Sequence, residues 1–518
     1  MAGWFDHNLD WVVDWRICQL LGCYKVFKSK TIGTSYRFVD MEVMKMARIK
    51  NNKKQTIIVT VLCLVCFGVG VLVPVIYQRA SSSSSDSKLE YVKNVLENDW
   101  YYADQVEDLD SLLTEQALTG MTTLDIDPHT NYFSLDQAKQ FSSSLQGTNT
   151  GIGIQFYQQD NGNIYVKYVF INSTADDAGL KSGDIITKIG DLDLASSTTD
   201  DIVTYIQDRD GKEIAVDYVR DGQTASVKLT PSEYDSTVIC NIYDGYGEII
   251  LSSFSSHSGD DVADAMARLK EAGITKMILD LRNNTGGYLS AAVEIASTFL
   301  PSDSVVFYEE DKDKNITEVK TDDSYGQIEM DQIVILQNDQ TASASEALIG
   351  ALKSHLKDKV TLVGQTTYGK GTEQTTVPFE DGTSIKYTIA RWLTPDKESI
   401  HEKGFEPDVA VEDTSIGSVS YTEMKEDDVI IADKVHVNAS ALQRFLEYLG
   451  YTVDRTDEYF SKTSSDSLKQ FQKDQGIAPT GNCDYTTWEK ILDMITQKYN
   501  ENSVNDDPIR NHGIELLG

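Results

Sequence analysis

The feature that most constrains the fold is an alternation of strand-like and helix-like patterns between residues 236 and 412. Short apolar runs such as "GEIILSSF", "KMILDLR", "QIVILQN" and "VTLVG" are separated by stretches whose apolar residues lie three and four apart, such as "VADAMARLKEAG" and "YLSAAVEIASTFL". Strands that alternate with helices predict a layered α/β domain. The stretch ends in a predicted hairpin, "TEQTTVPFEDGTSIKYTIARWL", that turns at Asp381-Gly382.

Length and charge limit the number of domains and the kinds of partner that the rest of the chain can have. Its 518 residues have room for three or four domains of ordinary size. The first 80 residues hold 11 Lys and Arg against 5 Asp and Glu, a net charge of +6, so the total of −35 leaves −41 on the remainder. So acidic a body argues against nucleic acid as a partner, because a phosphate backbone is bound by basic surfaces.

Residues 56–77, "TIIVTVLCLVCFGVGVLVPVIY", contain no charged side chain and predict a transmembrane helix. Five lysines and arginines precede this segment between positions 45 and 54, whereas Arg79 is almost alone after it. The positive-inside rule therefore places residues 1–55 in the cytoplasm and the rest of the chain outside a single-pass cell membrane anchor. A buried core helix is the alternative, and whether residues 1–40 belong to the protein stays open. A Ser-rich linker is expected at 78–87.

Cysteine usage indicates neither a disulfide framework nor a metal site. Of six cysteines, only Cys240 and Cys483 follow the predicted span, and no C-x-x-C pair with metal-site spacing occurs outside it. We therefore expect no metal and no cofactor. The state of the two cysteines stays open.

Periodicity and composition divide the remaining chain into five segments. They are a helical region at 88–145, a strand-rich domain at 146–232 with a predicted hairpin turn at Asp221-Gly222, an acidic linker at 413–432, a small helical domain at 433–497, and a polar tail at 498–518.

The segment "TASASEALIG" at 341–350 has two interpretations. Ser343 and Glu346 have the spacing of a capping box at a helix start. Ser343 could instead be a nucleophile, which requires a base and an oxyanion site. Lys370, flanked by glycines in "TTYGKGTEQ", is a candidate base, because burial can lower a lysine pKa from about 10.4 toward neutrality. Gln374, four residues on, could hold the amine without adding a charge.

An oxyanion site is expected where a buried strand ends in Gly286-Gly287 and a helix begins. One amide from this pair and the amide of Ala344 would bind the anion, and which glycine contributes is left open. The chain has neither G-x-S-x-G nor H-E-x-x-H. His257 beside Asp280 is the alternative arrangement for a Ser-His-Asp triad.

Several motifs resemble the carboxyl-terminal processing (tail-specific) proteases in the order of that family. They cover roughly residues 88–412 and are "DPHTNYFS", "DLRNNTGG", "TASASEALIGAL", "VGQTTYGKGTEQ", "DGTSIKYTIARWLTP" and "KGFEPDV". The resemblance implies a crotonase/ClpP-like serine-protease domain with Ser343, not Ser345, as nucleophile, Lys370 as base and Gln374 as its support. It also implies a homodimer through the helices at 88–145. Thr285 is a departure, since proline or glycine is common before the glycine pair.

The flanking domains have resemblances of their own. Residues 146–232 resemble a PDZ domain of bacterial proteases, with Gly151, Ile152, Gly153 and Ile154 at the carboxylate-binding loop. Residues 433–497, with "LQRFLEYLGY" and "SLKQFQKDQGI", resemble a peptidoglycan-binding domain of wall enzymes. The alternatives are a PDZ-like packing module with a blocked groove and a helical module that binds a protein partner.

The expected function is that of a membrane-anchored extracytoplasmic serine endopeptidase with a Ser-Lys pair. Its substrates would be proteins with accessible C-termini, recognised by the PDZ domain, and its C-terminal domain would bind peptidoglycan. The alternative is a catalytically inactive scaffold that links membrane and wall. The sequence does not reveal the physiological substrate or whether the PDZ domain inhibits or activates.

Overall fold

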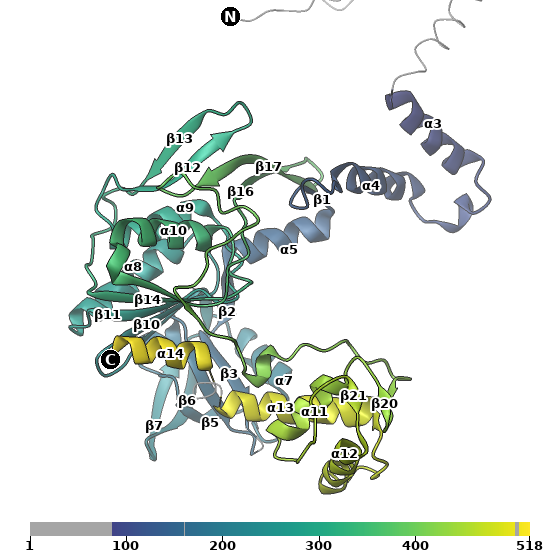
Figure 1. Ribbon diagram of the computed structural model, residues 1–518, viewed down its shortest axis with the longest axis vertical. Coiled ribbons are helices and arrows are strands. Elements are labelled where there is room, and N and C mark those ends of the chain that lie inside the picture. The colour runs from purple at the N-terminus through teal and green to yellow at the C-terminus, as the bar shows by residue number, and fades with distance from the viewer. Residues whose placement is uncertain (1–84, 160, 503–506) are drawn as a thin grey trace, which may run out of the picture. The chain divides into compact units, whose positions relative to one another are not determined.

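The computed structural model describes residues 85–159, 161–502 and 507–518 (Figure 1). They belong to two compact units, Met1–Asp104 and Gln105–Gly518.

In the first unit, α3 (Ser85–Asn98) begins within the predicted Ser-rich linker. The predicted transmembrane helix at 56–77 and the predicted cytoplasmic segment at 1–55 lie outside the described residues. Among the helices that are described, none is long and apolar enough to cross a membrane.

The second unit is built around a six-stranded sheet formed by the predicted apolar runs. Five neighbouring strands are parallel, and β9 joins one edge antiparallel to β10. The order is β18 (Val409–Ala410), β15 (Val360–Gly364), β14 (Gln332–Gln337), β11 (Lys276–Asp280), β10 (Gly247–Leu251) and β9 (Val238–Ile242). The central strands are buried on both faces, which is why they are apolar almost without interruption. The predicted layered α/β domain is confirmed.

Helices cover both faces of this sheet (Figure 1). One face packs against α8 (Ser258–Glu271), α9 (Leu289–Phe299) and α10 (Ala344–Leu356) to form the main hydrophobic core. The other face packs against α14 (Pro508–Leu517). Alternate residues of β14 serve the two faces: Ile333 and Ile335 belong to the main core, and Val334 and Leu336 contact α14.

The helix α14 corrects the prediction of a polar tail at 498–518. Its Arg510 forms an ion pair with Glu248 of β10, whose side chain is 1% exposed. Asp507 accepts two hydrogen bonds from Arg282, at 2.7 and 2.8 Å. The segment looks polar in sequence because its charges are paired at the sheet and only a few apolar residues, such as Ile509, are needed to cover one face.

A second sheet of five strands carries the predicted hairpin. β16 (Thr372–Pro378) and β17 (Ser384–Leu393) pair antiparallel around the turn with Gly382. The other strands are β1 (Asn131–Phe133), β12 (Val305–Asp311) and β13 (Ile316–Lys320), in the order β1-β17-β12-β13. The helices α4 (Leu109–Thr122) and α5 (Leu135–Gln146) flank β1 in the chain. The hairpin therefore lies beside a segment some 250 residues earlier in sequence, because Tyr132 pairs with Ile385.

A five-stranded antiparallel sheet forms most of the region 146–232, in the order β3-β4-β5-β6-β7. The predicted Asp221-Gly222 turn closes the hairpin of β6 and β7, and both residues have positive φ, as a tight two-residue turn requires. The elements of this region are β2 (Thr148–Gly151), β3 (Ile154–Gln158), β4 (Ile164–Val169), α6 (Thr174–Asp177), β5 (Ile185–Ile189), α7 (Thr199–Gln207), β6 (Ile214–Arg220), β7 (Gln223–Leu229) and β8 (Ser232–Asp235).

The C-terminal helical domain has its own core, centred on Trp488 and Phe445. Cys483 is buried there as a free thiol, and Cys240 of β9 is also free. The domain contains α11 (Ala439–Tyr448), α12 (Lys462–Asp474), α13 (Tyr485–Asn502), and two short ladders formed by β20 (Lys434–Val435) with β21 (Tyr459–Phe460) and by β19 (Val429–Ile430) with β22 (Cys483–Asp484).

The segment at 413–432, predicted as an acidic linker, is folded onto this domain rather than free. Ile416, Met424 and Ile430 are buried in the domain's core, and Ile430 pairs with Cys483. The three apolar residues are widely spaced in an acidic segment, so the sequence pattern did not predict that they are buried.

Candidate active site

The residues predicted for catalysis come together in a groove of about 960 Å³ in the second unit. Ser343, Lys370 and Gln374 all line this groove, together with Gly286 and Gly287. The walls are formed by α5, the loop before α9, and the hairpin of β16 and β17. Segments from five separate parts of the sequence therefore meet at one site.

Ser343 lies at a sharp turn between β14 and α10. Its φ and ψ are 60° and −115°, a backbone conformation that residues other than glycine rarely adopt and that costs about 1–3 kcal/mol. Two hydrogen bonds hold the turn: the amide of Ala342 donates to the carbonyl of Asn284 at 3.0 Å, and the amide of Ala347 donates to the carbonyl of Ser343 at 2.9 Å. Strain of this kind is retained when the surrounding structure imposes a particular direction on a side chain.

The other two hydroxyls of the segment have structural partners. Thr341 Oγ1 donates to the carbonyl of Leu281 at 2.9 Å. Ser345 Oγ donates to the carbonyl of Asn284 at 3.0 Å and is fully buried. Ser343 is therefore the residue of this segment that can present a hydroxyl to the groove.

Glu346 connects the turn at Ser343 to the loop with Lys370. Its Oε2 accepts hydrogen bonds from the backbone amides of Ser343 and Lys370, each at 2.8 Å. Its Oε1 accepts from the amide of Gly369 at 2.7 Å and from Thr367 Oγ1 at 2.6 Å. Burial raises the pKa of this carboxyl, and the four donors oppose that shift. The sequence identified Glu346 only as part of a capping box.

Lys370 has a fixed backbone and a half-buried side chain. Besides the bond to Glu346, its carbonyl accepts from Trp392 Nε1 at 3.1 Å. Burial, together with the charge of Lys386, lowers the pKa of the Lys370 ammonium to about 8, although Glu346 and Asp127 act in the opposite direction. An amine with this pKa is partly neutral near pH 7, as a general base must be.

Gln374 lies in the groove, and its amide is oriented by threonines. Nε2 donates to Thr372 Oγ1 at 3.0 Å and to Thr388 Oγ1 at 3.2 Å. Thr388 Oγ1 in turn donates to Asp127 Oδ1 at 3.1 Å. The described structure contains no hydrogen bond between Gln374 and Lys370. Asp127 belongs to the motif "DPHTNYFS", whose place at this site the sequence analysis missed.

The backbone amides of Gly287 and Ala344 have no acceptor in the described part of the chain. The amide of Gly286 is different, because it donates to Asn284 Oδ1 at 2.9 Å. Gly286 is required for another reason: a Cβ there would lie 2.8 Å from the Cβ of Ser343. Asn284, fully buried, also donates to the carbonyl of Leu251 at 2.8 Å, so it fixes the loop to β10.

The alternative triad through His257 does not form. The His257 side chain is 58% exposed and its Nδ1 lies 3.7 Å from Asp235 Oδ2. Asp280 binds Arg282 instead, with oxygen-to-nitrogen distances between 2.6 and 3.2 Å. Neither His257 nor Asp280 lines the groove that contains Ser343.

Comparison with known proteins identifies the chain. Residues 245–411 match peptidase family S41, residues 150–230 match the PDZ domain, and residues 436–491 match a peptidoglycan binding domain. The CtpA-like serine protease of Staphylococcus epidermidis is 32% identical over 417 residues, which cover 80% of this chain and 83% of that protein. The chain belongs to peptidase family S41. The CtpA-like serine protease of Staphylococcus aureus is 32% identical over 81% of this chain and 83% of that protein.

Among solved structures, this S41 peptidase is similar to the photosystem II D1 C-terminal processing protease. The identity is 22% and the TM-score 0.36, over 64% of this chain and 95% of that one. Membership of the family makes the chain a serine peptidase of the carboxyl-terminal processing type, with a PDZ domain and a peptidoglycan-binding domain.

In the PDZ domain of this peptidase, the loop from Gly151 to Ile154 precedes the edge strand β3. The amides of Ile152 and Gly153 have no acceptor in the described structure, whereas the carbonyl of Gly153 accepts from Phe170 at 3.0 Å. Gly153 has φ 81° and a Cβ there would collide with Ser173. The loop thus leaves two amide donors free beside an unpaired strand edge.

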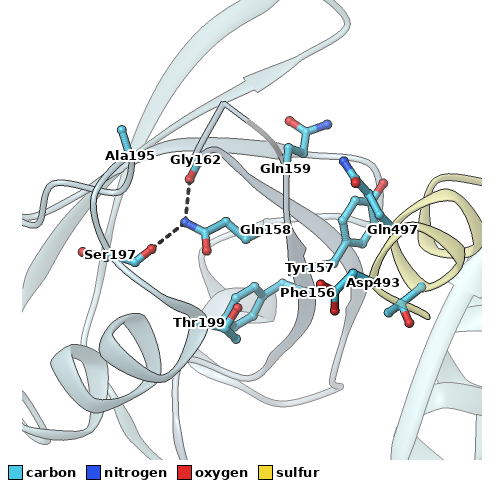
Figure 2. A pocket seen from close by; sticks show the side chains of 11 residues that line it. Phe156, Tyr157, Gln158, Gln159, Gly162, Ala195, Ser197, Thr199, Asp493 and Gln497 are labelled. Atoms are coloured by element: carbon cyan, nitrogen blue, oxygen red, sulfur yellow. Dashed lines mark hydrogen bonds between the residues drawn. The ribbon is translucent and has the colours of Figure 1, made fainter. Parts of the chain in front are cut away.

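At the other end of β3, a pocket of about 570 Å³ lies between the PDZ domain and α13 of the C-terminal domain. Figure 2 shows Gln158 in this pocket, donating from Nε2 to the carbonyls of Gly162 and Ser197, at 3.4 and 3.0 Å. Asp493 and Gln497 of α13 face the pocket from the other side.

Proposed function

We propose that this S41 peptidase hydrolyses peptide bonds with Ser343 as nucleophile and Lys370 as general base. One observation carries the proposal: both residues line one groove, and a single carboxylate oxygen of Glu346 holds both of their backbone amides. Burial also lowers the pKa of Lys370 to about 8, so a neutral amine is available without a histidine.

The reaction would proceed in two steps. Ser343 Oγ attacks the carbonyl carbon while its proton passes to the neutral Lys370 Nζ, and the oxyanion accepts hydrogen bonds from the amides of Gly287 and Ala344. The C–N bond then breaks as Nζ returns the proton to the leaving amine. Water attacks the ester carbon and loses a proton to Nζ. The ester C–O bond then breaks as Nζ returns that proton to Ser343 Oγ, which releases the carboxylic acid product and restores the hydroxyl.

Gln374 is proposed to position the lysine. Its Nε2 is engaged by Thr372 and Thr388, and Oε1 has no donor in the described part of the chain. Because Nε2 of Gln374 is held by these two threonines, Oε1 is left to accept a hydrogen bond from the Lys370 ammonium.

The substrates are proposed to be proteins with accessible C-termini, recognised by the PDZ domain. The free amides of Ile152 and Gly153 support this, because two adjacent N–H groups can bind a terminal carboxylate while the edge of β3 pairs with the peptide. Amidating the terminal carboxylate should then slow cleavage. Equal rates for the acid and the amide would leave the domain a packing role only.

Placement between membrane and cell wall is also part of the proposal. The uncharged segment 56–77 supports a single-pass anchor with the catalytic part outside, and the match of residues 436–491 supports binding to peptidoglycan. Sedimentation of the C-terminal domain with purified peptidoglycan tests the second point. A fragment that stays in the supernatant at low and moderate salt would contradict it.

A homodimer through the region 88–145 is supported by exposed apolar side chains, which monomeric proteins rarely concentrate in one segment. They are Leu89, Tyr91, Val92, Trp100, Tyr101, Tyr102, Leu112, Met121, Leu124, Ile126 and Leu135. Light scattering on the purified chain tests the dimer.

The experiment that tests the proposed chemistry compares the parent with Ser343→Ala on an unstructured protein that has an apolar C-terminus. Activity should fall by at least about 10³-fold. A variant as active as the parent would contradict the assignment of the nucleophile, and a parent with no activity would favour the scaffold alternative.

A further inference from the structure

Lys386 of β17 lines the same groove as Ser343 and Lys370, and the reaction proposed above does not use it. The strand lies between β1 and β16, because Lys386 pairs with Asn131 on one side and with Thr376 on the other. Its position in the middle of the sheet fixes the backbone, so the side chain extends into the groove from a rigid base.

The surroundings hold the Lys386 ammonium in place without neutralising it. Nζ lies 5.2 Å from the ring centre of Phe133 and 5.0 Å from that of Phe141, distances at which an aromatic face attracts a cation. No carboxylate lies within 4.0 Å of Nζ in the described part of the chain. Burial lowers the pKa of Lys386, and the charge of Asp127 raises it.

The groove is cationic although the protein is strongly acidic. Its charged lining consists of Lys139, Lys370 and Lys386 against the single carboxyl of Glu373. Burial and the neighbouring Glu309 raise the pKa of Glu373 to about 7, so its negative charge is incomplete near neutral pH. In a chain with a net charge of −35, a local excess of lysine favours an anionic group on the ligand.

We propose that Lys386 binds a carboxylate of the substrate in the active-site groove and thereby determines specificity close to the cleaved bond. The inference rests on the proposed function, because it assumes that the peptide lies in this groove. The carboxylate can be an Asp or Glu side chain beside the bond or the terminal carboxylate of a short tail. A half-buried, unpaired ammonium gains a charge-assisted hydrogen bond from either one.

The test uses the full-length protein and peptides of one neutral sequence. A single Asn is replaced by Asp, or in a further set by Lys, at each position flanking the cleaved bond, and each peptide is made with a free and with an amidated C-terminus. Cleavage of the neutral peptide with a free C-terminus tests the proposed function itself. The ratio of kcat/KM for the acidic and neutral peptides tests Lys386. The comparison of Asp with Asn reports on a side-chain carboxylate, and the comparison of the free with the amidated C-terminus reports on the terminal carboxylate.

The parent should favour a carboxylate at one position by about tenfold or more, chiefly through KM. Lys386→Gln should bring the ratio of kcat/KM for the acidic and neutral peptides close to one, and Lys386→Arg should retain most of the preference for the acidic peptide. Lys386→Glu should invert the preference, in favour of a peptide with Lys at that position. Lys139→Gln is the matched control: this lysine lines the same groove but is exposed, so the ratio should change less than about twofold.

Lys386 also lowers the pKa of Lys370, so its loss should alter kcat for all peptides alike and leave the ratio as an independent readout. A Lys386→Gln variant that slows every peptide equally and retains the preference would overturn the proposal. Equal kcat/KM of the parent for all the peptides would overturn it without any variant.

Discussion

Glu346 Oε2 lies 2.8 Å from the backbone nitrogen of Lys370 and accepts its hydrogen bond, although the two residues are 24 positions apart. The same oxygen accepts from Ser343 at the start of α10. Since four donors converge on one fully buried carboxylate, the loop with the candidate base and the turn with the candidate nucleophile are fixed to each other.

Replacing Glu346 with Gln should therefore damage activity more than stability. The amide nitrogen would face backbone N–H donors in place of an acceptor, and a shift of about 1 Å between nucleophile and base lowers kcat by about 10²-fold. Unfolding free energy should fall by about 1–3 kcal/mol. Peptidase assays and urea denaturation measure the two effects. Glu294→Gln on α9 is the control, and a Glu346 variant with the kcat of that control would contradict this role.

The pH dependence of the reaction follows from Lys370. The base acts in its neutral form, so kcat should rise with pH through a midpoint near the lysine pKa of about 8 and then reach a plateau. Lys386→Gln removes a neighbouring positive charge, which should move the midpoint to higher pH on a neutral peptide. A midpoint that stays in place or moves to lower pH would be inconsistent with a lysine base beside Lys386.

The sequence could predict those parts of the site whose residues lie close together in the chain. Ser343 and Lys370 could be proposed because each lies in a short pattern, a serine at a helix start and a lysine between glycines. The second role of Glu346 could not be predicted. Its partners at 367–370 follow β15 in the chain and come close to Glu346 only in the folded domain. Asp127 reaches Gln374 through Thr388, a contact across 261 residues that no local pattern contains.

The choice between Gly286 and Gly287 likewise depended on three-dimensional contacts. The amide of Gly286 is occupied by the side chain of Asn284, which only the folded loop reveals. The strands were predictable since their apolar runs are buried on both faces. The helix α14 was not, because its few apolar residues are separated by charges whose partners lie on β10 and after β11.

The ion pair between Arg510 and Glu248 predicts how α14 is attached. Arg510→Met leaves a carboxylate that is 1% exposed without its cation, with hydrogen bonds only from Asn241 and Tyr243, which should cost about 3–5 kcal/mol of unfolding free energy. Adding Glu248→Gln should restore much of the loss, because the unpaired charge is then removed. Urea denaturation of the two variants measures both effects. A single variant as stable as the parent would show that α14 contributes little.

Asp261 on α8 predicts a pH-dependent stability. Burial raises its pKa to about 6, and Oδ2 is buried without a hydrogen-bond partner among the described residues. Because the folded-state pKa lies above the ordinary value of 3.8, its contribution is present below about pH 4 and is lost as the pH rises through 6. Asp261→Asn should therefore raise the unfolding free energy at pH 8 by about 1–3 kcal/mol and make little difference at pH 4. The reverse order would contradict the raised pKa.

The central claim is that Ser343 becomes acylated and that Lys370 activates it. The most direct measurement is to react the enzyme with a peptide ester, quench the mixture in acid and locate the acyl group by mass spectrometry. The acyl group should lie on Ser343, should be absent from Ser343→Ala, and should form much more slowly in Lys370→Met. In the parent, the rate of acylation should rise with pH through about 8. An acyl group on another residue, or unchanged acylation in Lys370→Met, would contradict the account.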